Sequence, residues 1–497
     1  MGKPASGQAG FTHFNRGRTE STVLALDRYT VVTHPADGSA RDLELFVSVS
    51  VSLTATRRQN PGGQIANRRE DRMKLLFIHE RLGAFGGAEA NIRITARELQ
   101  ARGHSTALLY AQGTGRDEAG CRNLFAGCHQ IPREKSPLQD LIAQCAPDLI
   151  YLHSLENLDA MERVFEASVP VIRMVHDHSL YCLRSYKYNP LTRKPCTRPA
   201  SGYCIFPCAA PITRNRGGLL PFKWSSFSDR RREIGLTHRC QALVAYSQHS
   251  KAELVGNGFD PKRIHIHVPM ECQGERHPVS RFGERNLVLF AGQIIRGKGV
   301  DLLLRALSRI KTSFECIIAG DGSHRAYCER LCRRLGLASK VQFTGYLPPT
   351  ELEKLYQDAS VFAFSSVWPE PFGMAGPEAM RFGLPVVGFD AGGVREWLLN
   401  GENGFLVPWA DTTAFAARIE DLLRDKELAR RLGLNGRERV NREYNAARQI
   451  DGLEHLFSET IGGSRKKTFR ESPILQNELE PASLLRASPA AGIVCNV

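Results

Sequence analysis

Short apolar runs, each followed by a glycine-rich stretch and then by a segment with helical spacing, constrain the fold of this chain most strongly. Residues 75–79 are apolar, residues 83–89 are rich in glycine, and residues 90–102 have helical spacing that stops at Gly103. A second apolar run follows at 105–110. This order predicts βαβ units, in which a parallel sheet carries helices on both faces.

The same order starts again near residue 286, after a polar stretch. We expect strands at 149–153, 169–176 and 242–247 in the first half, and at 287–291, 314–319, 340–344, 360–364 and 385–389 in the second, with a helix at 300–311. The prediction is therefore α/β: two Rossmann-like, doubly wound domains at 73–270 and 286–440, joined by a hinge at 271–285. A ligand should bind in a cleft between them, where strands end. A helix at 441–461 is expected to pack back on the first domain.

The two ends of the chain differ from this pattern. Residues 1–72 are rich in Ser, Thr, Arg and Gly, and we expect a disordered extension, with the functional protein starting near Met73. An alternating stretch at 43–53 could form one strand, but no neighbouring stretch could pair with it. Residues 462–497 are expected to be a disordered tail.

Composition limits the classes of protein. The 497 residues can hold two cores plus tails, and no apolar run approaches the roughly 18–20 residues of a membrane-spanning helix. Because the first 25 residues lack an apolar stretch, a cytoplasmic location is expected, and thiols or a metal are favoured over disulfides for the 13 cysteines.

The net charge of +14 is unevenly distributed. Residues 181–240 contain 12 Lys or Arg against two acids, Asp229 and Glu233. This surface could simply be solvated, or it could bind anionic lipid or a phosphorylated acceptor. Nucleic acid is disfavoured as a partner because no nucleic-acid motif is visible.

The segment at 369–385 combines two acids with a glycine-rich turn. Glu370 and Glu378 are eight positions apart, between two expected strands, and the turn between them leads into a helix. Such a turn offers backbone N–H groups and a helix dipole to phosphate, while the carboxylates can accept hydrogen bonds from sugar hydroxyls. These features predict a ligand clamp at the carboxyl end of a sheet.

Over residues 73–460, the chain resembles the family 4 retaining glycosyltransferases of the GT-B architecture (glycosyl transferases group 1). The motifs that carry the resemblance are residues 86–89, 292–299 with Lys298, 320–322, 370–378, 383–387, 392–396 and 401–408. Single glycine-rich loops are common, but this many motifs in this order are specific.

The resemblance implies a role for each matching position. Glu378 would hold the ribose, Glu370 a hydroxyl of the donor sugar, and Lys298 the diphosphate; His176 would line the cleft near the transferred sugar. The remaining implied donor contacts are Gly86, Gly87, the backbone around Phe372, Gly373 and Met374, and the peptide groups of Tyr346 and Leu347, which would read the base edge.

Two positions depart from the family pattern. Gln293 stands where members often have Arg, so Arg296 is expected to supply the second positive charge on the diphosphate. Residues 269–271 read Pro-Met-Glu where members often have Asn-Gly-Val-Asp.

Other polar residues near expected strand ends have competing interpretations. His176 and His153 could contact the ligand or could be satisfied within loops. Asp177 could cap a helix, and Glu89 could complement a helix dipole or bind ligand. Asp321, between two glycines, is interpreted as a turn residue rather than a ligand.

Four cysteines lie close together in the sequence, in a long connection rich in Pro and Tyr. Cys182, Cys196, Cys204 and Cys208 could bind a structural Zn²⁺, remain free thiols, or include a redox pair. Their spacing suggests zinc without requiring it.

The predicted activity is transfer of a sugar from a nucleoside diphosphate sugar to an acceptor, with retention of configuration and no cofactor in catalysis. A saccharide or lipid-linked acceptor in cell-surface polysaccharide or lipopolysaccharide synthesis is expected, with possible contact to the inner face of the membrane. A GT-B-like epimerase or phosphorylase and a non-catalytic sugar-nucleotide-binding subunit are the alternatives.

Overall fold

The structure is a computed structural model and describes residues 22–26, 29–33, 72–83, 86–132, 137–189, 191–214, 222–224, 226–268, 279–282 and 285–462. The chain divides into two units, residues 1–68 and 69–497. In the first unit, β1 (Thr22–Leu26) pairs antiparallel with β2 (Tyr29–Thr33), a pair that the sequence did not predict. The predicted strand at 43–53 and the tail beyond Gly462 lie outside the described residues.

The first domain of the second unit is built on a seven-stranded parallel sheet. Its order is β11-β10-β7-β6-β3-β4-β5. The strands are β3 (Lys74–Leu82), β4 (Ser105–Gly113), β5 (Gly127–Gln130), β6 (Leu149–Leu152), β7 (Val171–Met174), β10 (Ala242–Ala245) and β11 (Ile264–Ile266). Ile78 of β3 is in register with Leu109 of β4 and Leu152 of β6, and all three side chains are buried.

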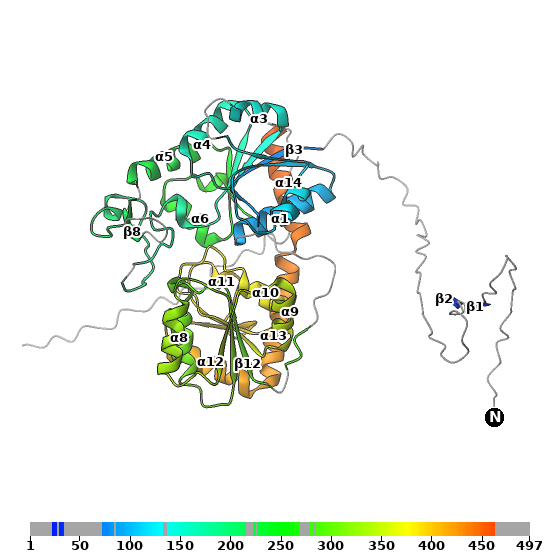
Figure 1. Cartoon of the computed structure of the whole chain (residues 1–497), viewed down its shortest axis with the longest axis vertical. Helices are drawn as coiled ribbons and strands as arrows, with labels where there is room; N and C mark the ends of the chain where they lie inside the picture. Colours follow the sequence, from blue (N-terminus) through cyan, green and yellow to red (C-terminus); the bar gives the residue numbers. More distant parts are fainter. Residues whose placement is uncertain are drawn as a thin grey trace, which may run out of the picture. The chain divides into compact units, whose positions relative to one another are not determined.

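Helices cover both faces of this sheet (Figure 1). They are α1 (Gly87–Ala101), α2 (Glu118–Leu124), α3 (Pro137–Cys145), α4 (Leu158–Val164), α5 (Phe227–Thr237) and α6 (Gln248–Gly256), with short 3₁₀ turns η1 (Phe165–Ala167), η2 (His178–Leu180), η3 (Gly202–Cys204) and η4 (Pro261–Arg263). The long connection after β7 contains η2, η3 and a small antiparallel pair, β8 (Ile212–Arg214) and β9 (Phe222–Trp224), and extends from the side of the domain (Figure 1).

The second domain has a six-stranded parallel sheet in the order β14-β13-β12-β15-β16-β17. Its strands are β12 (Leu287–Ala291), β13 (Glu315–Ala319), β14 (Val341–Gly345), β15 (Val361–Phe364), β16 (Val386–Phe389) and β17 (Gly404–Val407). Its helices are α7 (Val300–Leu307), α8 (Arg325–Arg334), α9 (Pro349–Asp358), α10 (Ala375–Arg381), α11 (Val394–Trp397), α12 (Thr412–Arg424) and α13 (Lys426–Glu443), with η5 (Arg296–Lys298) before α7.

Gly299 shows why the loop before α7 requires glycine. It is the N-cap of α7 with φ of +67°, in the left-handed region, and a Cβ there would lie 2.0 Å from the carbonyl oxygen of Ser365. Only glycine allows the loop to approach β15 this closely. The close approach holds Lys298 beside the chain that leaves β15.

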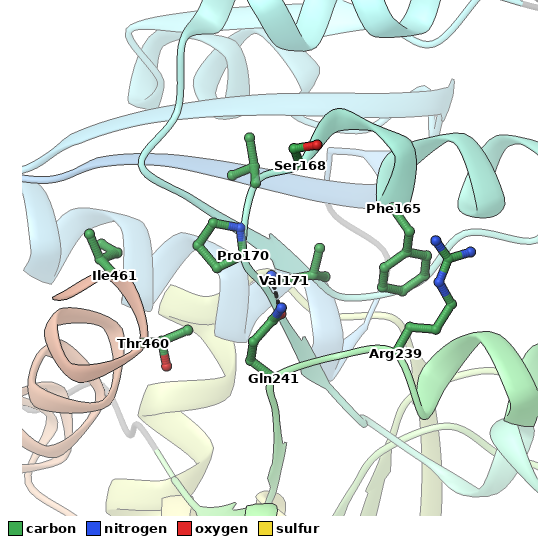
Figure 2. A pocket seen from close by; sticks show the side chains of 9 residues that line it. Phe165, Ser168, Pro170, Val171, Arg239, Gln241, Thr460 and Ile461 are labelled. Carbon is green, nitrogen blue, oxygen red and sulfur yellow. Dashed lines mark hydrogen bonds between the residues drawn. The ribbon is translucent and has the colours of Figure 1, made fainter. Parts of the chain in front are cut away.

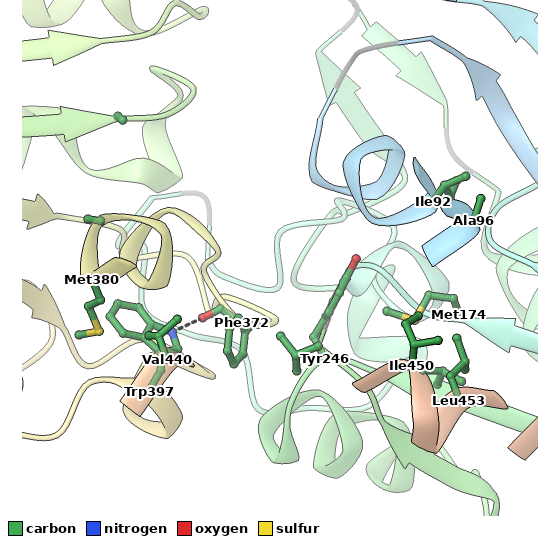
Figure 3. Packing of buried hydrophobic residues seen from close by; sticks show 14 of the residues in the cluster. Ile92, Ala96, Met174, Tyr246, Phe372, Met380, Trp397, Val440, Ile450 and Leu453 are labelled. Atoms are coloured by element: carbon green, nitrogen blue, oxygen red, sulfur yellow. Dashed lines mark hydrogen bonds between the residues drawn. The ribbon is translucent and has the colours of Figure 1, made fainter. Parts of the chain in front are cut away.

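The last described helix, α14 (Ala446–Gly462), returns to the first domain. Tyr151 of β6 meets Phe457 edge-to-face with ring centroids 5.1 Å apart, and His104 lies 2.8 Å from the Glu454 carboxylate. One buried apolar cluster includes Met174 and Tyr246 of the first domain, Phe372 of the second, and Ile450 and Leu453 of α14 (Figure 3). The two domains and α14 thus share a core.

The predicted α/β class and the two Rossmann-like domains are confirmed. The strand predicted at 287–291 matches β12, whereas the helix predicted at 300–311 ends at Leu307. The helix expected from 441 begins at Ala446, because α13 continues to Glu443. Most of the predicted hinge lies outside the described residues.

Candidate functional site

The first domain contacts the chain around Glu370 directly. His178, in η2 just after β7, is fully buried, and its Nε2 lies 2.5 Å from the carbonyl oxygen of Pro369. The hydroxyl of Ser250 donates to the carbonyl oxygen of Pro371 at 3.2 Å, and the hydroxyl of Ser247 donates to the same oxygen. These contacts bring the carboxyl edges of the two sheets together at Glu370.

A carboxylate of the second domain adds a further contact between the domains. Glu396 of α11 accepts hydrogen bonds from the backbone N–H groups of Gln248 and His249, both at 2.9 Å. These groups begin α6, where a negative charge complements the helix dipole. Burial raises the pKa of the Glu396 carboxyl, and the two N–H groups oppose that shift. The sequence placed Glu396 within a motif but did not predict this role.

Lys298 and Glu370, predicted as separate donor contacts, touch one another. The Lys298 Nζ lies 2.6 Å from Glu370 Oε1 and 5.2 Å from the centroid of the Trp368 ring. Glu370 is 4% exposed, whereas the Lys298 side chain is 24% exposed and remains accessible. The pair places one cation and one hydrogen-bond acceptor at a single point, at the carboxyl edge of the second sheet.

The turn after Glu370 is fixed by packing. Phe372 is buried, and its carbonyl oxygen accepts from Trp397 Nε1 at 2.7 Å (Figure 3). Gly373 has φ of +94°, and a Cβ there would lie 2.7 Å from the Phe364 ring. Met374 is half-buried and occupies the position directly before α10. The expected donor contacts of this turn remain predictions.

Glu378 lies in α10 and is half-exposed. Burial raises the pKa of Tyr356 well above its ordinary range, and the charge of Glu378 contributes to that shift, which places the two side chains near one another. Its assignment to the ribose remains a prediction.

The long connection of the first domain holds both the start of α7 and the loop before it. Arg193 donates to both oxygens of Asp301 at 2.9 and 2.7 Å, and these side chains are 13% and 6% exposed. Arg296 donates to the carbonyl oxygen of Leu191 at 3.0 Å, while Gln293 is exposed. Arg296 therefore has a protein acceptor in addition to its predicted phosphate role, and Arg193 was missed from sequence.

Histidines gather where neighbouring strands of the first sheet end. His153 Nδ1 lies 2.8 Å from His176 Nε2, and His176 Nδ1 lies 2.8 Å from the Tyr246 hydroxyl. Burial lowers the pKa of both histidines well below 6.5, and positive charge on neighbouring histidines lowers it further. The structure thus places predicted His176 in a buried network with His153, and its contact with a sugar remains a prediction.

His79 was not singled out from sequence. It lies within β3, directly after Ile78, which is in register with Leu152 of β6, so His79 is level with His153. The His79 Nε2 lies 3.2 Å from Glu89 Oε1, and its Nδ1 lies 3.0 Å from the Ser154 hydroxyl. Burial raises the pKa of Glu89, but the hydrogen bond from His79 and the backbone N–H outweigh burial, so the pKa is lowered. Glu89 is therefore held as an acceptor at the start of α1.

The remaining predicted donor contacts are spread around the site. The Gly86 N–H donates to Glu89 Oε2 at 2.9 Å, and Gly87 begins α1 in open space, since a Cβ added there would meet no atom within 4 Å. Tyr346 is 70% exposed, with the Arg116 guanidinium 5.9 Å from its ring centroid, and Leu347 is half-buried. Tyr346 thus lies near a first-domain cation, and its predicted contact with a base remains open.

Asp177 and Asp321 both act locally. The Asp177 carboxylate accepts from the Ser179 N–H at 2.7 Å and caps η2, as one interpretation had it. The Asp321 carboxylate accepts from the Gly322 N–H at 2.7 Å, which agrees with a turn residue.

The four clustered cysteines are free thiols of intermediate exposure. Burial raises the pKa of Cys182, and the nearby Cys204 raises it further. Among the residues that the structure describes, no three Cys, His, Asp or Glu side chains are grouped as metal ligands. The arrangement lends no support to the predicted zinc site at Cys182, Cys196, Cys204 and Cys208, which stays a prediction.

A hollow of about 450 Å³ lies at the other edge of the first sheet (Figure 2). It is lined by Val171 and Gln241 at the beginnings of β7 and β10, by Phe165 and Arg239, and by Ile461 of α14. Because Val171 begins β7 and Gln241 directly precedes β10, the hollow lies at the amino ends of these strands and is separate from the Glu370 site, which lies where strands end.

Two family models match successive parts of the chain. Residues 85–267 match the model described as Glycosyltransferase Family 4, and residues 273–439 match Glycosyl transferases group 1. The Anabaena protein Alr3699/HepE, solved with UDP and glucose, matches with a TM-score of 0.60 and 20% identity, over 78% of this chain and 100% of that one. Two parallel sheets whose carboxyl edges meet at Glu370 define a GT-B protein. The chain belongs to the group 1, family 4 glycosyltransferases.

Curated relatives match over part of their length. An uncharacterised glycosyltransferase of Methanocaldococcus jannaschii is 30% identical over 218 residues, which are 43% of this chain and 56% of that protein. The lipopolysaccharide core biosynthesis glycosyltransferase LpsE of Rhizobium meliloti is 30% identical over 172 residues, 35% of this chain and 49% of LpsE. The matches thus span about half the length of these relatives.

Proposed function

We propose that this protein transfers a sugar from a nucleoside diphosphate sugar to an acceptor, with retention of the anomeric configuration. The observation that carries the proposal is the contact between Lys298 and Glu370, held against the first domain through Pro369 and Pro371. The UDP bound to the structurally similar HepE supports a nucleotide-sugar donor.

Each residue then has a chemical task. The diphosphate replaces Glu370 as the partner of Lys298, and this cation stabilises the negative charge that grows as the leaving group departs. The freed Glu370 accepts a hydrogen bond from a sugar hydroxyl, and Glu378 accepts from the ribose. Arg296 supplies further positive charge, and we propose that no metal is needed there.

The acceptor is proposed to be a saccharide or a lipid-linked saccharide of a surface polysaccharide or lipopolysaccharide. The similarity to LpsE supports this class. In the part of the chain that the structure describes, no helix has the length and apolarity needed to cross a membrane. We propose action in the cytoplasm with peripheral contact to an anionic membrane.

A donor panel tests the proposal. Thermal unfolding is measured with UDP- and GDP-sugars, and products are then analysed by NMR for anomeric configuration, with and without EDTA. We expect one donor to raise the unfolding temperature and to yield a retained product in EDTA. No stabilisation by any sugar nucleotide would contradict the proposal. Binding without turnover would favour a non-catalytic subunit, and an isomerised donor would favour an epimerase.

A further inference from the structure

The long connection of the first domain presents an apolar turn to solvent. In the turn formed by residues 201–209, which includes η3, Tyr203 is 37% exposed, Ile205 51% and Phe206 84%. Large apolar side chains at this exposure, close together in sequence, are typical of an interaction surface. We call residues 201–209 the apolar turn.

Hydrogen bonds inside the apolar turn fix this presentation. The N–H groups of Ile205 and Phe206 both donate to the carbonyl of Gly202, at 3.0 and 3.1 Å, and the N–H of Cys208 donates to the carbonyl of Tyr203 at 3.1 Å. Backbone groups that are already paired lose little when they leave water, which is a requirement for entry into a lipid interface. The apolar turn can therefore bring its side chains to a membrane without refolding.

The base of the apolar turn is anchored to the domain. Arg184 donates to the carbonyl oxygens of Cys208 and Ala209 at 3.1 and 2.8 Å, and Ala210 is buried. The Ala200 N–H donates to the Asn257 side chain after α6 at 2.8 Å. The exposed side chains therefore project from a fixed base.

The charge around the apolar turn selects its partner. In the sequence, no Asp or Glu occurs from His178 to Ser228, whereas eight Lys or Arg do. Two of these, Lys187 and Arg193, are paired with Glu253 and Asp301 and do not add to the surface charge. Lys194 and Arg198 are exposed, and the Arg198 guanidinium lies 4.3 Å from the centroid of the Tyr203 ring. A second copy of the chain would bring the same positive charge and be repelled, whereas anionic lipid would be attracted.

We propose that the apolar turn is the membrane-docking element of this protein, with Tyr203, Ile205 and Phe206 entering the interface of an anionic bilayer and Lys194 and Arg198 contacting its headgroups. The proposal deepens the proposed function, on which it rests, by naming the surface that reaches a membrane-bound acceptor. The same connection also contacts the second domain: its Arg193 donates to Asp301, and its Leu191 carbonyl oxygen accepts from Arg296. Membrane docking and donor binding would therefore involve the same segment.

Vesicle co-sedimentation of the full chain tests the proposal. Vesicles of phosphatidylcholine alone are compared with vesicles containing phosphatidylglycerol, at low and high salt. We expect binding only to the anionic vesicles, weakened by salt. Replacing Ile205 and Phe206 together by Ser should weaken binding about tenfold or more. Replacing Lys194 and Arg198 by Gln should also weaken it roughly tenfold.

Leu434→Ser is the matched control, because Leu434 is 42% exposed on α13 of the other domain. Unfolding temperature and sugar-nucleotide binding in solution should be unchanged in every variant, which separates failure of docking from failure of the proposed function. Unchanged vesicle binding by the Ile205 and Phe206 variant would overturn the proposal. So would a dimer in sedimentation velocity that this variant abolishes, since the apolar turn would then bind a second copy.

Discussion

Lys298 has two partners in the proposed reaction: Glu370 before the donor binds, and the diphosphate afterwards. Removal of the Lys298 ammonium takes away the cation that would bind the diphosphate, and it leaves the buried Glu370 carboxylate without its cation. We expect Lys298→Ala to lower kcat by about 10²–10³-fold with a smaller change in donor KM. Steady-state kinetics check this. Lys311→Ala, at an exposed lysine, should behave as the parent, and a defect confined to acceptor KM would contradict the phosphate role.

Glu378 is predicted to act in binding rather than in the chemical step. Loss of a carboxylate that accepts from two ribose hydroxyls should weaken donor binding roughly 10–100-fold. Isothermal titration of Glu378→Ala with the donor measures this, with the exposed Glu402→Ala as control. If Glu378→Ala bound the donor nearly as tightly as the parent, the assignment of Glu378 to the ribose would be wrong.

His153 gives the protein a predicted acid sensitivity. Its folded-state pKa lies well below 6.5, so the unfolded chain binds the extra proton first as the pH falls. The contribution of neutral, buried His153 to the free energy of unfolding is therefore complete above pH 6.5. Below pH 6.5 it falls by about 1.4 kcal/mol per pH unit. We therefore expect the free energy of unfolding, measured with urea between pH 5 and 8, to fall less steeply toward low pH in His153→Gln than in the parent. His238→Gln, at an exposed histidine, should keep the parent slope.

At the scale of elements, the connection after β7 and the helix α7 are joined by Arg193 and Asp301. Breaking this largely buried pair from either side should cost about 3 kcal/mol and lower kcat/KM for the donor. Arg193→Asp and Asp301→Arg are each expected to be impaired, while the double swap should recover part of both properties. Arg305→Asp, exposed on the same helix, should have little effect. Additive losses in the double variant would count against the pair.

Central strands could be predicted from sequence, because burial on both faces leaves continuous apolar runs such as that of β12. Edge strands were predicted less completely: β14 agrees with the strand expected at 340–344, whereas β5 reads Gly-Cys-His-Gln, has no apolar run and was missed. Glu370 and Lys298 were predictable individually from motifs. Their contact, and that of His178 with Pro369, join positions 72 and 191 residues apart, and no local pattern encodes such a pairing.

At the scale of the whole molecule, one apolar cluster joins both domains and α14. Because Tyr246 and Phe372 belong to the same buried core, opening one domain exposes apolar surface of the other. We expect a single calorimetric transition for residues 72–462 within the full chain, with equal calorimetric and van't Hoff enthalpies. Two resolved transitions, one shifted by sugar nucleotide and one not, would show that the domains unfold independently.

The return of α14 to the first domain also has a consequence for biosynthesis. Tyr151 is translated about 300 residues before Phe457, which covers it. During that interval the nascent first domain must expose part of its interior to solvent, where it is prone to aggregate or to bind chaperones. A message cut short before codon 446 should therefore yield insoluble product, even though both sheets are fully encoded.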